Sequence, residues 1–426
     1  MDQRDRIREL PAGILDNVLG LLPIVEAART AVLSTYWRDA WYELSRLEFD
    51  EEYYNYMYDN LTPYLEVIDQ VLKQHIGPIQ KFSIYTTEKV YESEFDELFL
   101  LVTHKGIDAI GIYLDCNAFM KYRLPSCIFS CRTLKALHLF GVNIEPINAP
   151  LIFPNVNSLF FKSVRFGATN HHLHAVNVPM LESLSYTQCS GISHFDITAP
   201  KLGSLSIKGC FADVDDDDDD DGDDDERDGE VDNDGNDNGS ATEKGENKLG
   251  SGFLPMNLDL TSIRTLHLCS DSIEGFVDDI CKMRPKLLAL NVEYLEFSGF
   301  YFPFSYVNSK FVKLLRRCPK LCELDICCQF GGLESTLGID GVSDLLEDLH
   351  GIDQTHNRLH TLKFSLFRGL RPELLFIKEL LVRFPTCVKL IISLNKMFDS
   401  HKKCEIMEEL VCLTIDSTTR AEIVFV

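Results

Sequence analysis

Leu134-Lys135-Ala136-Leu137-His138-Leu139 places leucines at the first, fourth and sixth positions of a six-residue unit. Alternation over the last three positions is typical of a strand with one buried face. Most neighbouring units begin 21 to 29 residues apart. The same apolar spacing occurs at Ile79-x-x-Phe82-x-Ile84, Ile107-x-x-Ile110-x-Ile112, Val156-x-x-Leu159-x-Phe161, Leu181-x-x-Leu184-x-Tyr186, Leu202-x-x-Leu205-x-Ile207, Ile263-x-x-Leu266-x-Leu268, Val292-x-x-Leu295-x-Phe297, Leu321-x-x-Leu324-x-Ile326, Leu359-x-x-Leu362-x-Phe364 and, more weakly, Cys387-x-x-Leu390-x-Ile392.

This spacing is typical of leucine-rich repeats, in which each unit adds one short parallel strand and stacked neighbours bury a continuous core. The sequence therefore predicts an α/β solenoid with parallel strands and irregular repeats. A doubly wound α/β enzyme would need longer helices between its strands and a glycine-rich phosphate loop, and neither is evident.

The residue between the last two apolar positions of each unit is predicted to face outward, on the concave side of the solenoid. A protein target is expected to bind there. We single out Phe160, because aromatic anchors often dominate interfaces; a register shifted by one residue would instead place Phe160 in the core. The predicted target-binding row consists of His138, Phe160, Ser185, Ser206, His267, Glu296, Asp325 and Lys363.

The first 45 residues predict three short helices. An apolar stripe follows Pro11 at spacings of one, three and four residues, which is the helical pattern. Trp37 and Trp41, the two tryptophans of the chain, lie four residues apart and share one face of the third helix. So short a unit cannot readily hold a core by itself, so it needs a partner surface or the following domain.

This unit resembles a plant F-box in the order and spacing of Leu10-Pro11, Ile14-Leu15, Val18-Leu19, Leu21-Leu22-Pro23, Ala27-Ala28-Arg29-Thr30, Val32-Leu33-Ser34, Trp37-Arg38 and Trp41. The resemblance implies docking on a Skp-family adaptor and, through it, on a cullin. Trp37 and Trp41 are expected to hold the unit together. Most of the adaptor-binding surface is expected from Leu10, Pro11, Ile14, Leu15, Leu19 and Leu22.

The carboxyl-terminal stretch resembles the FBD region of many plant F-box proteins with leucine-rich repeats. The similar residues are Leu362-Lys363-Phe364-Ser365, Phe367-Arg368-Gly369, Glu373, Ile377-Lys378-Glu379-Leu380-Leu381, Phe384-Pro385, Leu390 and Ala421-Glu422-Ile423-Val424-Phe425. The resemblance implies two strands that flank a helix and a final strand that extends the sheet. Both resemblances together imply the substrate-recognition subunit of an SCF-type ubiquitin ligase, a non-catalytic receptor whose protein target the sequence does not identify.

An acidic tract interrupts the repeats. Residues 213–248 contain 19 acidic and 3 basic residues, a net charge of −16 within a chain total of −25. Low hydrophobicity and high charge predict a disordered insertion at 213–252. The tract suggests an alternative function, a leucine-rich-repeat protein outside any ligase that binds basic proteins such as histones. Nucleic-acid binding is not expected, because neither the tract nor the remainder carries a basic footprint.

The sequence contains no pattern that indicates bond chemistry. It lacks a Gly-x-Ser-x-Gly elbow, a phosphate-binding loop and a His-Glu-x-x-His helix. No cofactor or metal is expected: the cysteines 318, 322, 327 and 328 contain no C-x-x-C pair, and His171, His172 and His174 lack a further ligand at a telling spacing. No membrane span or secretory signal is apparent, so the 14 cysteines are read as reduced thiols in cytoplasm or nucleus.

The predicted domain organisation has six parts. These are the F-box at 1–45, a linker or helical connection at 46–78, a first set of repeats at 79–212, the acidic insertion at 213–252, a second set of repeats at 253–354 and FBD-like repeats at 355–426.

Overall fold

The structure is a computed structural model. It describes residues 10–88, 91–115, 122–145, 152–167, 176–210, 253–287, 289–300, 305–328, 349, 358–394, 398–415 and 421–426. The predicted acidic insertion and the histidines at 171–174 lie outside these residues, so their interpretation rests on sequence alone.

A thirteen-stranded sheet runs through the described residues, with every pair of neighbours parallel and the strands in chain order. A mixed α/β class with a large parallel sheet, as predicted, is therefore confirmed. The strands are β1 (Arg46–Phe49), β2 (Lys81–Thr86), β3 (Ala109–Leu114), β4 (Ala136–Phe140), β6 (Ser158–Lys162), β9 (Ser183–Thr187), β11 (Ser204–Lys208), β12 (Thr265–Cys269), β13 (Tyr294–Phe300), β14 (Glu323–Cys328), β15 (Thr361–Phe367), β16 (Lys389–Leu394) and β17 (Glu422–Phe425).

The repeated apolar positions align across the sheet. Leu137 pairs with Ile110 on one side and Leu159 on the other, and all three side chains are buried. The sixth position of the unit forms a second buried column two residues further along each strand. Each fully buried aliphatic side chain contributes roughly 1.5–3 kcal/mol, so stacking supplies the stability that one short strand lacks.

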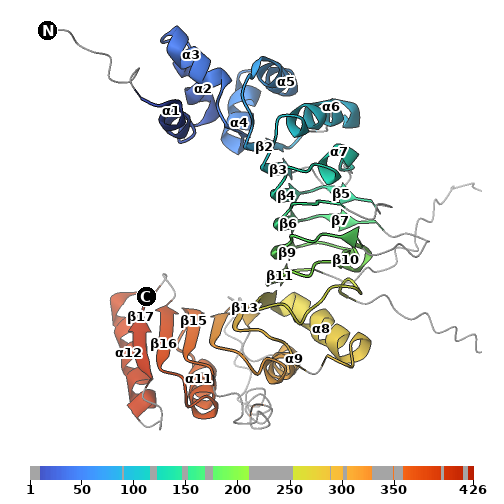
Figure 1. The fold of residues 1–426 in the computed structure, drawn as a ribbon. Helices are drawn as coiled ribbons and strands as arrows, with labels where there is room; N and C mark the ends of the chain where they lie inside the picture. Colours follow the sequence, from blue (N-terminus) through green and yellow to red (C-terminus); the bar gives the residue numbers. More distant parts are fainter. Residues whose placement is uncertain are drawn as a thin grey trace, which may run out of the picture.

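Helices cover the outer side of the curved sheet, as Figure 1 shows for α5, α6, α8, α9 and α11. In the middle of the arc, two short strand pairs take their place: β5 (Asn143–Ile144) with β7 (Arg165–Phe166), and β8 (Val176–Asn177) with β10 (Ile197–Thr198). The helices are α1 (Ala12–Leu19), α2 (Ile24–Thr30), α3 (Thr35–Tyr42), α4 (Glu51–Asp59), α5 (Tyr64–Gln74), α6 (Glu92–Thr103), α7 (Ser126–Phe129), α8 (Ser270–Asp278), α9 (Ser305–Arg316), α11 (Arg371–Arg383) and α12 (Ser400–Ile415), with short 3₁₀ and π segments at Ile192–His194 and Asp279–Met283.

Three short helices form the amino-terminal unit, as predicted. Pro11 and Pro23 directly precede α1 and α2, where the fixed φ of proline suits the entry into a helix. Ser34 caps α3 by accepting a hydrogen bond from the Trp37 amide at 3.4 Å. The Asp16 carboxylate in α1 accepts hydrogen bonds from the Ser45 amide at 2.7 Å and the Ser45 hydroxyl at 2.6 Å. These contacts join the helices to the first strand of the sheet.

The stretch 46–78 was predicted as a linker or helical connection, and the structure adds a strand to its helices. It contains α4, α5 and the strand β1, which pairs with β2 and begins the sheet. Leu44-x-x-Leu47-x-Phe49 has the full repeat spacing, and all three side chains are buried. The sheet therefore starts one repeat earlier than predicted and follows the helical unit without a spacer.

No described helix combines the length and the apolar character needed to cross a bilayer.

Candidate partner-binding surfaces

The helical unit exposes an unusual amount of apolar surface. Ile14 and Val18 lie four residues apart on one exposed face of α1, and Leu10, two residues before the helix, is also exposed. Leu21 and Leu33, in the loops after α1 and α2, are 83% and 69% exposed. The set is completed by Leu22 and Val32. Exposed apolar groups gathered in so small a unit mark a binding surface.

Four of the six residues predicted to bind an adaptor lie on this surface. Leu10, Pro11, Ile14 and Leu22 are exposed. Leu15 and Leu19 are instead 3% and 0% exposed, because they lie about 100° around α1 from Ile14 and Val18, on the side that the rest of the chain covers. These two residues are therefore not part of the exposed surface in this conformation, and their role in adaptor binding stays a prediction.

The two tryptophans lie toward the interior. Trp41 is buried, and Trp37 is half-buried and packs against the same core cluster. The hydroxyl of Tyr36, beside Trp37, donates a hydrogen bond to the Leu10 carbonyl at 3.2 Å. The start of α3 therefore lies beside the start of α1, so the exposed residues of both helices and their loops belong to one unit.

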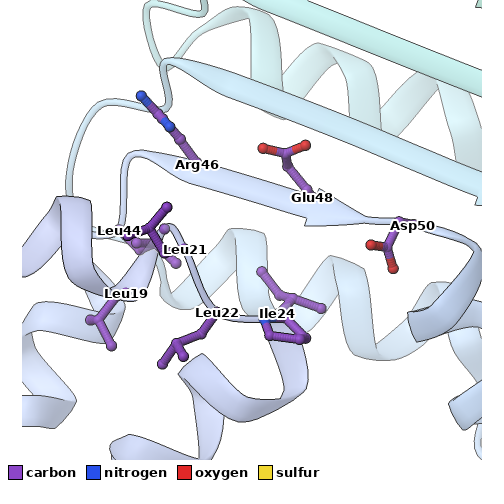
Figure 2. Close-up of a pocket in the computed structure, with 10 residues that line it drawn as sticks. Leu19, Leu21, Leu22, Ile24, Leu44, Arg46, Glu48 and Asp50 are labelled. Atoms are coloured by element: carbon purple, nitrogen blue, oxygen red, sulfur yellow. The ribbon is translucent and has the colours of Figure 1, made fainter.

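A pocket of about 260 Å³ lies between the α1–α2 loop and β1. Figure 2 shows Leu21, Leu22 and Ile24 on the loop side and Arg46 and Glu48 along the strand. One wall is apolar and the other is charged. This pocket adjoins the exposed apolar surface and connects it with the open face of the sheet.

The predicted target-binding row is a continuous line across the sheet. His138 pairs with Phe160, Phe160 with Ser185, and the register continues without a shift to Lys363. Residues two positions further along each strand lie on this same open face, because side chains alternate between the two faces of a sheet with a period of two. The line continues beyond the predicted members to Glu48, Ser83 and Gly111 at one end and to Ile391 and Val424 at the other.

Phe160 lies on the open face, so the alternative register is excluded. Its neighbour Phe161 is fully buried, whereas Phe160 is half-buried and its ring lies 5.5 Å from that of His138. The sequence-based interpretation of Phe160 as an anchor on this face is therefore compatible with its position.

Charged groups of the row form ion pairs in the second half of the sheet. Glu296 accepts hydrogen bonds from Lys208 Nζ and His267 Nδ1, both at 2.8 Å. These two donors, His267 foremost, lower the pKa of Glu296 to about 2 against the opposing effect of burial. Further along, Asp325 accepts from Lys363 Nζ at 2.6 Å, which raises the pKa of that lysine. The charged side chains in this part of the face are therefore held in place by one another, and their carboxylates are paired with cations of the same chain.

Glu296→Gln is expected to lower the free energy of unfolding by about 2 kcal/mol at pH 7. A carboxyl whose pKa is depressed in the folded state stabilises it above the pKa of the unfolded chain, near 4.5, and loses this effect as the pH falls toward 2. The difference from the unaltered chain should therefore shrink between pH 5 and pH 2, as measured by urea unfolding across that range. Glu323→Gln, an exposed residue of β14, is the control and should cost less than about 0.5 kcal/mol throughout. A pH-independent difference would contradict the assignment.

Within the described residues, no group of three or more histidine, cysteine or acidic side chains is arranged to hold a metal ion. Cys318 and Cys328 are buried, and burial raises the pKa of both thiols, to about 12 for Cys318. Both thiols therefore stay protonated at neutral pH and pack as small apolar groups.

Stacked parallel-strand units that carry a small helical unit with exposed apolar side chains place the chain in the class of α/β repeat proteins with candidate surfaces for protein partners. No protein-family model matches the chain. An F-box/FBD/LRR-repeat protein of Arabidopsis thaliana is 32% identical to it over 218 residues, which are 49% of this chain and 50% of that protein. A second F-box/FBD/LRR-repeat protein of this plant is 27% identical over 213 residues, 48% of this chain and 49% of that protein.

An FBD-associated F-box protein of the same plant is 27% identical over 215 residues, 48% of this chain and 50% of that protein. The chain spans about half the length of these curated relatives. It is a relative of the plant F-box/FBD/LRR-repeat proteins, so the predicted resemblance is confirmed.

Proposed function

We propose that this chain is the substrate-recognition subunit of an SCF-type ubiquitin ligase. The observation that carries the proposal is the exposed apolar surface of α1 and the two loops beside it. Burial of apolar surface is the main favourable contribution to the free energy of protein association. A partner that covers these exposed side chains would provide this burial. The similarity to F-box proteins supports a Skp-family adaptor in this role, with a cullin bound through it.

The domain assignment follows the sequence with one change. We assign residues 1–45 to an F-box, 79–212 and 253–354 to leucine-rich repeats and 355–426 to FBD-like repeats. Residues 46–78 become the first repeat, because β1 is the first strand of the sheet. The acidic tract at 213–252 is retained as an insertion between repeats.

The receptor would position the target protein relative to the ligase and would supply no reactive group. An adaptor docked on the helical unit and a target on the open face of the sheet would be held by one chain. Bringing a target lysine to the ligase in this way raises its effective concentration. We therefore propose a non-enzymatic subunit that works in the cytoplasm or the nucleus and recognises a protein, with no nucleic acid, membrane or cofactor involved.

Co-purification tests this function. The intact chain, expressed together with a plant Skp-family adaptor and a cullin, is expected to retain both through several washes. Deletion of residues 213–248 separates the two functions suggested by the sequence. A ligase receptor should still bind the adaptor, whereas a protein whose acidic tract binds histones should lose histone binding on deletion. Failure of the intact chain to retain the adaptor would overturn the proposal.

A further inference from the structure

A second pocket, of about 340 Å³, lies on the open face over the first four strands. Strands β1 to β4 are successive neighbours in the sheet, and β1 directly follows the helical unit in the chain. The volume of the pocket is at the lower end of the range for ligand sites, which suits one long side chain. The lining residues are Glu48, Asp50, Glu51, Lys81, Ser83, Tyr85, Ala109, Ile110, Gly111, Tyr113 and His138.

Gly111 lines this pocket. It is the glycine of the target-binding row, between Ser83 on β2 and His138 on β4. A Cβ at this position would lie 2.8 Å from Tyr113 Cε2 and 3.1 Å from the Ser83 Cβ. The absence of a side chain therefore lets the Tyr113 ring lie close to the backbone of Gly111, and this ring lines the pocket.

Carboxylates exceed cations in the pocket lining. Glu48, Asp50 and Glu51 supply three negative charges, and Lys81 supplies one positive charge that is held by Glu48 at 2.7 Å. Burial and the nearby Lys81 lower the pKa of His138, so this ring is neutral at pH 7. Glu48 lies on β1, and Asp50 directly follows this strand, where it also caps α4 by accepting a hydrogen bond from the Tyr53 amide at 3.0 Å. A net negative rim thus surrounds tyrosine rings.

We propose that this pocket binds a basic side chain, an arginine or lysine, of the target protein. A cation over the face of a tyrosine ring is attracted by the ring quadrupole, and the surplus carboxylates pair with the same charge. Acidic side chains would be repelled, and neutral ones would leave the rim without a counter-charge. This inference rests on the proposed function in that it names a property of the recognised target.

N-acetyl-arginine N-methylamide is a suitable probe, because it carries the side chain and two peptide bonds without other groups. Titration into the full chain, followed by saturation-transfer NMR, should show binding with a Kd of about 1–10 mM. The citrulline analogue has the same shape and no charge, so it is the matched control ligand and should not bind measurably.

Glu48→Gln combined with Glu51→Gln should weaken the arginine probe about tenfold, roughly threefold for each exposed carboxylate. Glu323→Gln, on β14 in the other half of the sheet, should leave its affinity unchanged. Gly111→Val adds a side chain where the Tyr113 ring now lies and displaces this ring, so this variant should not bind the arginine probe measurably.

Adaptor co-purification with the same variants keeps the two proposals separate. Equal binding of arginine and citrulline, or no binding of arginine by a chain that retains its adaptor, would overturn the pocket and leave the receptor function standing. Arginine binding that depends on Glu48 and Glu51 in a chain that retains no adaptor would support the pocket while overturning the receptor function.

Discussion

A chain that carries Ile14→Asp and Leu22→Asp is expected to bind a Skp-family adaptor at least a hundredfold more weakly than the intact chain. Both side chains are more than two-fifths exposed, at 46% and 41%, so they are free to be covered by a partner. Each substitution removes an apolar contact and places a carboxylate where it would lose water, which costs several kcal/mol in a buried interface. Surface plasmon resonance with immobilised adaptor measures the loss.

The same double variant should unfold in urea within about 1 kcal/mol of the intact chain, because neither side chain belongs to the core.

The variant Leu19→Ala should show the opposite pattern, a loss of stability without a loss of affinity. Leu19 is fully buried, so this substitution should cost about 2–5 kcal/mol of stability and leave the affinity of the folded fraction nearly unchanged. Val388→Asp, at an exposed apolar residue before β16, should affect neither measurement. A stable double variant that still binds the adaptor would show that the contact lies elsewhere.

The contrast between Ile14 and Leu19 marks a limit of sequence reading. Apolar residues at spacings of one, three and four predict a helix with one buried stripe. On α1 both stripes are apolar, since Leu15 and Leu19 are buried while Ile14 and Val18 are exposed. Periodicity alone cannot assign the two faces, because the neighbouring α3 and the first strand decide which one is covered.

The sheet could be predicted more fully. Leucines at the fourth and sixth positions of a unit face the core by the twofold period of a strand, and Leu137 and Leu139 do so. The same period correctly placed Phe160 outside. The unit at Leu44-x-x-Leu47-x-Phe49 was missed because it begins inside the stretch that resembles an F-box. The FBD resemblance implied a helix between two strands, and α11 lies between β15 and β16. The other elements on the outer side of the arc could not be predicted, since helices and two-residue strands both fit the variable segments between repeats.

The pocket at Gly111 had no signal of its own in the sequence. A glycine in a strand weakens it and often marks a close approach of another group. Which group approaches depends on the Tyr113 rotamer and on the register that brings Ser83 and His138 alongside. The row itself was predictable once its period was known, and Glu48 would have joined it had β1 been recognised.

The turn between β15 and α11 gives a physical reason for part of the FBD-like pattern. Gly369 has a φ of +71°, in the left-handed region that favours glycine, and a Cβ there would lie 2.6 Å from Ile406 Cγ1 of α12. Glu373, four residues later, is completely buried. Its carboxylate accepts hydrogen bonds from the amides of Arg368 and Leu370 at 3.1 and 3.0 Å and from Arg368 Nε at 3.2 Å. One side chain thus ties the turn to the first turn of the helix.

Glu373→Ala is therefore expected to lower the free energy of unfolding by about 3–5 kcal/mol. The change leaves the largely buried Arg368 guanidinium and two amides without their acceptor, and it opens a cavity beneath α11. Glu373→Gln keeps the shape and one acceptor oxygen, so its cost should be smaller, about 1–2 kcal/mol. Glu379→Ala, in the same helix, removes an i,i+4 pair with Arg383 at 2.8 Å and should cost under about 1 kcal/mol. Urea unfolding of the three variants at pH 7 tests this order. Equal losses for Glu373→Ala and Glu379→Ala would mean that the buried carboxylate does not hold the turn, and that the pattern around Glu373 has another origin.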